Sequence, residues 1–272
     1  MEKQVRLSNS TPPVARLGLA TRGDTSLQAE DCFLALERGV NYWNWCGRED
    51  GMSRAVRELG ANRNQVVLAV QMEATRASQA EEELDNHLRT LATDRIEGVT
   101  LYYMETRAEW DRVRAKGGAL DFLRTCKREG TVGLIGVTTH QRPLAVEIAA
   151  SGEMDLLMIR YNAAHRGAES EVLPLCDRLR LPTVAFTCLR WGALIEHPRA
   201  PGWQGKIPSA SDCYRFVLSN PSVSVALMAP DNRDELKDNL RLLEDWRALS
   251  VDERRWMREW GDFVHATGGQ FP

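Results

Sequence analysis

The chain has 272 residues, of which 43% are hydrophobic and 27% charged, as is ordinary for a soluble globular protein. A formal net charge of −3 and a pI near 6.0 exclude the basic surface that nucleic-acid binding requires. No apolar run approaches the roughly 18 residues that span a bilayer, and the first residues contain no secretory signal. We therefore expect a cytoplasmic protein that binds a small molecule and neither nucleic acid nor membrane. The sequence leaves the oligomeric state open.

The cysteines and histidines do not form the spacings of a metal site. The six cysteines are scattered without a CxxC pair, and the five histidines show neither HxxxH nor HExxH spacing. Scattered cysteines of this kind are typical of free thiols in a reducing compartment. We expect no bound metal.

Apolar runs of strand length alternate with helix-period segments along the whole chain. The predicted strands are residues 15–20, 41–45, 66–71, 96–103, 131–137, 156–161, 182–189 and 222–228. The predicted helices are residues 25–38, 52–59, 78–91, 121–128, 143–151, 172–179, 209–219, 233–243 and 251–266, the first and third opened by capping boxes at Thr25/Gln28 and Ser78/Glu81. Eight βα repeats with short connections predict one α/β domain over residues 1–272, a (β/α)8 TIM barrel.

Several motifs occur in an order that resembles the aldo-keto reductases. Residues 39–47 resemble the family's Gly-φ-Asn-φ-φ-Asp-Thr-Ala, residues 130–138 its Gly-Lys-φ-Arg-x-φ-Gly-φ-Ser, and residues 185–192 its strand-seven motif. The resemblance spans nearly the whole chain. It implies a (β/α)8 barrel that reduces carbonyl groups with NAD(P)H.

The catalytic tetrad of that family is replaced at every position. Where the family has Asp, Lys and His, this chain has Asn44, Gln71 and Tyr102, and residues 48–51 contain no tyrosine. Neutral amides at both charged positions keep the hydrogen bonding and leave no buried charge to solvate. Since a general acid contributes about 10²–10⁴-fold to a rate, ordinary carbonyl reduction should be impaired. Tyr102 is the candidate acid; the alternative is a hydrogen-bonding or packing role.

The resemblance also implies contacts with a dinucleotide. Thr138 and Thr139 take the positions that hold the nicotinamide amide, and Phe186 takes that of the stacking aromatic residue. The other cofactor-binding candidates are Asn44 at the mouth, Thr187, Leu189 and Gly192 at the diphosphate, Arg233 beside the adenosine and Asn239 at the adenine. NADP or NAD would be the cofactor. The alternative is an inherited groove that is empty or serves another ligand.

Two further functions fit the residues expected at the barrel mouth. Glu73, Tyr102, His140 and Arg160 could serve an isomerase, lyase or hydrolase if they converge on one cavity. Arg160, near the end of a buried strand, should need an anionic partner, and we expect Glu73 or His140 nearby. Trp43, Trp45 and Trp191 are expected to line the same mouth. The third alternative is a non-catalytic pseudoenzyme or binding subunit.

Overall fold

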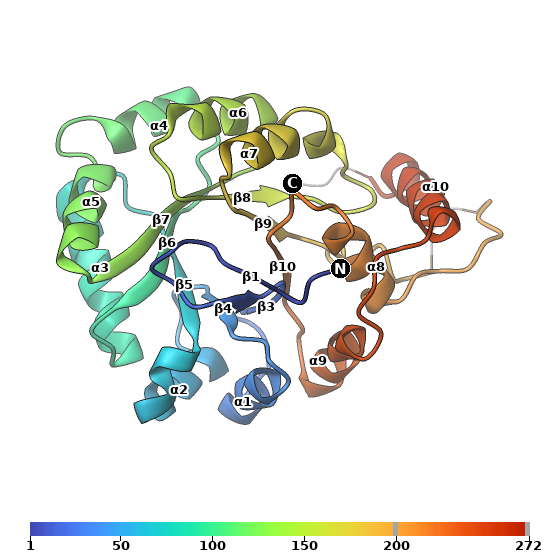
Figure 1. The fold of residues 1–272 in the computed structure, drawn as a ribbon, viewed down its shortest axis with the longest axis horizontal. Helices are drawn as coiled ribbons and strands as arrows, with labels where there is room; N and C mark the ends of the chain where they lie inside the picture. The colour runs from blue at the N-terminus through green and yellow to red at the C-terminus, as the bar shows by residue number, and fades with distance from the viewer. Residues whose placement is uncertain (198–200, 270–272) are drawn as a thin grey trace.

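A closed barrel of eight parallel strands forms the centre of the computed structural model, which describes residues 1–197 and 201–269 (Figure 1). The barrel strands are β3 (Leu17–Ala20), β4 (Tyr42–Trp45), β5 (Val67–Met72), β6 (Ile96–Leu101), β7 (Val132–Thr139), β8 (Leu156–Arg160), β9 (Thr183–Phe186) and β10 (Val225–Met228). They pair in chain order, and β10 closes the ring against β3. The predicted (β/α)8 barrel is confirmed.

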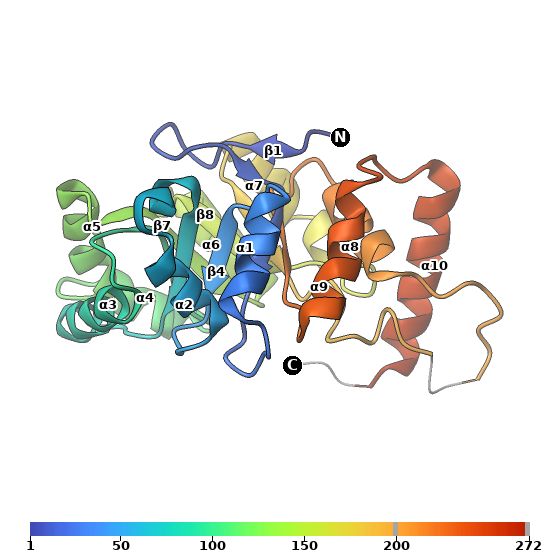
Figure 2. The same ribbon diagram turned by 90° about the horizontal axis from the view of Figure 1, so that it is seen from below.

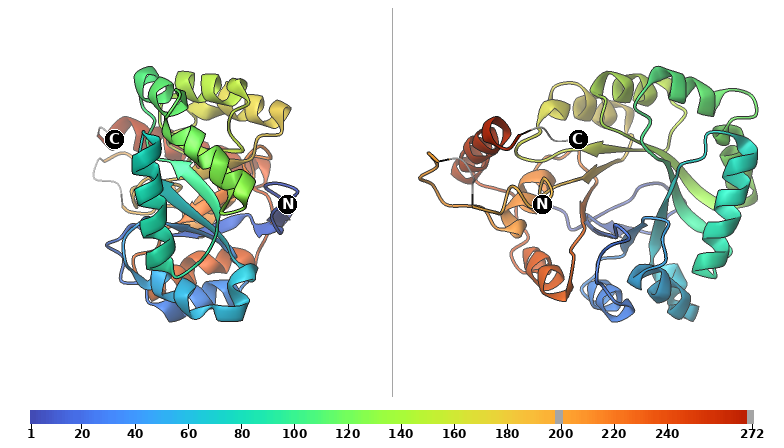
Figure 3. Two further views of the ribbon diagram at one scale, coloured as in Figure 1. Left: turned by 90° about the vertical axis from the view of Figure 1, so that its left-hand side faces the viewer. Right: turned by 180° about the vertical axis from the view of Figure 1, so that it is seen from behind.

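Helices cover the outside of the strands, as the views in Figure 3 show. They are α1 (Ala29–Glu37), α2 (Gly51–Glu58), α3 (Ala77–Leu91), α4 (Arg107–Arg114), α5 (Ala119–Glu129), α6 (Arg142–Ser151), α7 (Val172–Leu179), α8 (Ala210–Leu218), α9 (Arg233–Leu240) and α10 (Val251–Thr267). In α2, for example, Met52, Ala55 and Val56 recur at helical spacing and are all buried. Among the described residues, no helix is long and apolar enough to cross a membrane.

The capping boxes predicted for two helices are wrong. Helix α1 begins four residues after Thr25, where Gln28 and Asp31 form the capping box. Asp31 is the better partner because its carboxylate accepts the backbone N–H of Gln28. Helix α3 begins after Arg76 without a side-chain cap, so the predicted Ser78/Glu81 box is also wrong.

Besides the short 3-10 helices η1 (Gly60–Gln65) and η2 (Gly167–Glu169), a hairpin and an α-helix were not predicted from the sequence patterns. A short antiparallel hairpin, β1 (Gln4–Val5) and β2 (Val14–Ala15), precedes the barrel. Leu7 and Val14 of this segment pack into the same apolar cluster as the barrel interior. Figure 2 shows the hairpin at the end of the barrel opposite the loop that leads into α1. The hairpin therefore closes the end of the barrel where the strands begin. The other missed element is α4, which buries only Trp110 and Val113.

Alternate residues of each strand face the barrel interior. Tyr42, Ala69, Leu134, Leu156 and Val184 belong to this inner cluster. Gly18 makes room for the Tyr42 ring, because a Cβ on Gly18 would lie 2.9 Å from Tyr42 Cδ1. Two residues further along β4, on the same inner face, Asn44 reaches the carboxyl end of the barrel.

Candidate functional site

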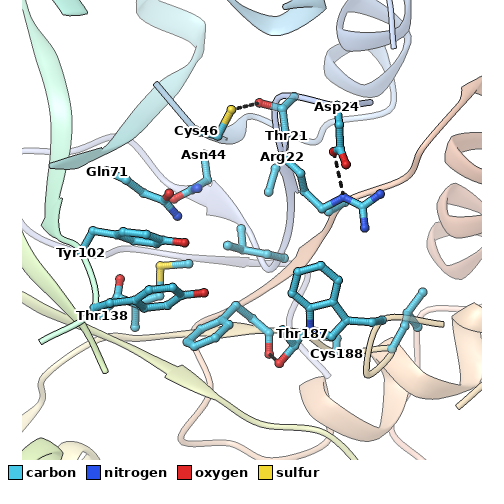
Figure 4. A pocket seen from close by; sticks show the side chains of 18 of the residues that line it. Thr21, Arg22, Asp24, Asn44, Cys46, Gln71, Tyr102, Thr138, Thr187 and Cys188 are labelled. Atoms are coloured by element: carbon cyan, nitrogen blue, oxygen red, sulfur yellow. Dashed lines mark hydrogen bonds and ion pairs between the residues drawn. The ribbon is translucent and has the colours of Figure 1, made fainter. Parts of the chain in front are cut away.

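A cavity of about 360 Å³ opens at the carboxyl ends of the strands, where the active sites of such barrels lie (Figure 4). Its wall is mostly aromatic and apolar. It is lined by Ala20, Thr21, Arg22, Asp24, Asn44, Cys46, Arg48, Gln71, Glu73, Tyr102, Tyr103, Thr138, Met158, Phe186, Thr187, Cys188, Leu189, Trp191, Tyr214, Leu227 and Ala229. The volume is at the lower end of the range for small-molecule sites.

Three buried polar atoms in the cavity wall have no hydrogen-bond partner among the described residues. One is Nε of Arg22, and the two oxygens are Oδ1 of Asn44, on β4, and Oγ1 of Thr138, on β7. Both side chains are almost fully buried, with exposures of 2% and 1%. A buried oxygen without a partner costs about 1–3 kcal/mol, so these two atoms mark where a ligand or a water would be bound.

Tyr102 follows β6 and points into the cavity beside Gln71 and Thr138 (Figure 4). Its ring stacks on Tyr103, with centroids 3.8 Å apart. Burial raises the pKa of the Tyr102 phenol, and Tyr103 and the negative charge of Glu73 raise that pKa further. Tyr102 is therefore protonated at neutral pH and is a weak acid.

Glu73 lines the cavity from the loop after β5, and Glu83 on α3 holds that loop in place. The Glu83 carboxylate accepts the backbone N–H groups of Glu73 and Ala74, each at 2.9 Å. Burial alone would raise the pKa of Glu83, but hydrogen bonds from His87 and from these two amides lower it overall. An ionised Glu83 thus fixes the turn that presents Glu73.

His140 and Arg160 are not part of the cavity wall. The His140 backbone N–H donates to Glu105 Oε1 at 2.8 Å, and its Nδ1 lies 3.1 Å from the same oxygen. Burial lowers the pKa of Arg160, and the negative charge of Glu105 opposes this shift. The carboxylate near Arg160 is thus Glu105, where the sequence favoured Glu73 or His140. The four side chains proposed for a non-redox enzyme do not converge on one cavity.

The cofactor-binding candidates divide into two groups. Asn44, Thr138, Phe186, Thr187 and Leu189 line the cavity. Thr139, Gly192, Arg233 and Asn239 do not: Thr139 Oγ1 accepts the backbone N–H of Gln141, and Asn239 is buried in α9. Arg233, at the start of α9, is bound to the buried carboxylate of Asp31.

The tryptophan prediction is wrong for two of the three residues. Trp43 and Trp45 are fully buried outside the cavity, and Trp191 lines it. Arg22 and Arg48 also line the cavity and were not among the residues predicted for the site. Arg22 comes two residues after Ala20, the last residue of β3, so reading every strand end would have found it.

A (β/α)8 barrel with a cavity at the carboxyl ends of its strands is the scaffold on which barrel enzymes carry their active sites. The sequence model of the Aldo/keto reductase family matches residues 20–253, and the chain belongs to this family. It is therefore a member of an oxidoreductase family.

Relatives agree with this assignment. The "Uncharacterized oxidoreductase YrpG" of Bacillus subtilis (strain 168) is 23% identical, over 98% of this chain and 95% of its own length. The holo form of aldo-keto reductase AKR11C1 from Bacillus halodurans superimposes with a TM-score of 0.76 at 17% identity, covering 95% of this chain and 96% of that one. The glycerol dehydrogenase AKR11B4 from Gluconobacter oxydans gives a TM-score of 0.75 at 14% identity, covering 98% and 97%. At these identities the two structures support the fold alone.

Proposed function

We propose that the cavity binds the nicotinamide end of NAD(H) or NADP(H), in an oxidoreductase barrel with impaired ordinary carbonyl reduction. The observation that carries this proposal is the pair of unpartnered buried oxygens, Asn44 Oδ1 and Thr138 Oγ1, in a cavity that Phe186 also lines. A carboxamide can donate to and accept from the Thr138 hydroxyl, and a ribose hydroxyl can donate to Asn44. Phe186 offers a π-face to a flat ring.

The residues present fit the nicotinamide end better than a 2′-phosphate. Arg233 is already bound to Asp31, and Arg22 to Asp231, so these two cations have acidic partners. A 2′-phosphate would have to compete with these carboxylates. We therefore expect NADH to bind more tightly than NADPH.

The residues of the cavity are poorly suited to donating a proton. A bound nicotinamide supplies hydride transfer. Of the three tyrosines that line the cavity, Tyr102 is our candidate for giving a proton to a developing alkoxide. Its pKa is raised, and the neutral amides of Asn44 and Gln71 carry no charge that would lower it. The cavity therefore supports binding and orientation better than proton transfer.

Titration with NADH and NADPH, followed by tryptophan fluorescence or calorimetry, tests the proposal. We expect NADH binding, weakened about tenfold in Thr138→Val because a hydrogen bond of roughly 1–1.5 kcal/mol is lost. Thr139→Val is the matched control. It removes the neighbouring hydroxyl, which bonds to the Gln141 amide outside the cavity, and should leave the Kd unchanged. Absence of binding at millimolar concentrations of either dinucleotide would refute the proposal.

A further inference from the structure

Three loops of the barrel mouth meet at the side chain of Arg22, which follows β3. Its guanidinium forms an ion pair with Asp231, in the loop after β10. The same group lies over the ring of Trp191, in the loop after β9, with Cζ 5.9 Å from the ring centroid. Asp24 is a further acidic neighbour, 3.7 Å from Arg22 Nε. Arg22 and Trp191 both line the cavity, so these contacts join three sides of its rim.

The loop that carries Trp191 is strained. Thr187, Arg190 and Trp191 have φ values of 53°, 50° and 54°, a left-handed conformation that costs a non-glycine residue energy. The buried Arg190 holds this loop, donating to the carbonyl groups of Val264, Gly268 and Gly269 at the end of α10. Trp191 nevertheless remains 61% exposed. The backbone conformation therefore holds the large apolar ring of Trp191 at the rim of the cavity, where much of the ring is exposed to solvent.

The segment that contains Arg22 also covers the thiol of Cys46. Thr21 Oγ1 donates to Cys46 Sγ at 3.6 Å. A Cβ built on Gly23 would lie 3.3 Å from the same sulfur atom. Cys46 is half-buried and lines the cavity, and the other five cysteines are buried. A movement of residues 22–24 away from the sulfur atom would therefore increase the exposure of Cys46 to a small reagent.

We propose that Arg22 is the gate of this cavity. It joins the loops after β3, β9 and β10, and a ligand passes the rim when the contacts with Asp231 and Trp191 break. Arg22 and Asp231 are partly exposed, and such pairs are weak, so the gate opens often. The same contacts control access for whichever ligand the cavity binds.

Alkylation of Cys46 by iodoacetamide, measured by mass spectrometry, tests the gate without any ligand. The thiolate displaces iodide and forms a C–S bond, and the reagent is neutral, so surface charge does not steer it. Arg22→Gln should label about three- to tenfold faster, as expected for the loss of one weak ion pair and one cation–π contact. Added salt should speed labelling of the wild type and have little effect on the variant.

Arg48→Gln is the matched control, because it removes the same charge from the same rim. Arg48 packs on Gly23 through carbon atoms that glutamine retains. It should label at the wild-type rate, whereas Asp231→Asn and Trp191→Ala should resemble Arg22→Gln. Thermal unfolding of each variant verifies that the fold persists. Equal rates for wild type and Arg22→Gln, or equal acceleration by Arg48→Gln, would overturn the proposal.

Discussion

The carboxylate of Glu105 clamps His140 from two directions, through the backbone N–H and through Nδ1 of the ring. Glu105 also accepts from the Gln141 side chain at 3.0 Å. The His140 ring lies against Tyr103 and Phe186, with centroids 4.7 and 5.2 Å away. These contacts tie the loop after β6 to the loop after β7, behind the cavity wall.

His140 should accordingly matter for stability and little for ligand binding. We expect His140→Gln to lower the free energy of unfolding by about 1 kcal/mol, the usual value of one hydrogen bond. Glu105→Ala should cost more, because it also leaves the His140 amide without its acceptor. Urea denaturation and the Kd for NADH measure the two effects. A loss of binding in His140→Gln with unchanged stability would contradict this assignment.

Asn44 and Gln71 are both neutral. We expect the site to tolerate a charge at one of these positions only if the other carries the opposite charge. Asn44 is paired with Ala69 in the sheet, two residues before Gln71 on β5, and both amides line the cavity. Gln71→Lys alone should destabilise the protein by about 1–3 kcal/mol, since it places an unpaired charge in a poorly solvated site. Adding Asn44→Asp should recover most of this loss.

A double-mutant cycle in urea measures that coupling. The surface substitution Gln65→Lys, at an exposed position, controls for the change of residue type. If the double variant is as unstable as the sum of the two single variants, the amides do not act as a pair. The cycle also shows whether the charged pair implied by the family resemblance can be rebuilt here.

His165 should make folding stability depend on pH. Burial, with the positive charges of Arg160, Arg190 and His265, lowers the pKa of His165 from 6.5 to about 4. Between these values the unfolded chain binds a proton that the folded protein does not, so stability decreases as the pH falls from 6.5 to 4. Unfolding midpoints across this range should show a shallower decrease in His165→Gln. His197→Gln, at an exposed histidine, is the control and should keep the wild-type slope. If the unfolding midpoint of His165→Gln depends on pH as steeply as that of the wild type, the prediction is contradicted.

The barrel could be predicted from local patterns because each strand is a short apolar run bounded by turn residues. Residues 66–71 illustrate this, since the run is covered on both faces and becomes β5 shifted by a single residue. The hairpin β1–β2 could not, because two-residue strands carry no periodicity. Helix α4 could have been found, since Thr106 and Glu109 form a capping box before a mostly charged helix.

Only the site residues at the ends of strands could be predicted from the sequence. Asn44, Gln71, Tyr102, Thr138 and Phe186 lie in the cavity wall because the inward-facing residues of neighbouring strands meet at one end of the barrel. The loop contacts were not predictable. Arg22 with Asp231 and Arg233 with Asp31 join residues about 200 positions apart. Such pairing depends on how loops and helix starts from opposite ends of the sequence meet in space.

The hairpin β1–β2 closes the amino end of the barrel, so the cavity opens at the other end. Leu7 and Val14 fill the amino end of the barrel together with its interior side chains. The cavity is therefore a blind well, and every molecule enters and leaves through the same opening. Where two molecules share such a well, the one bound nearer the opening blocks the exit of the one bound deeper.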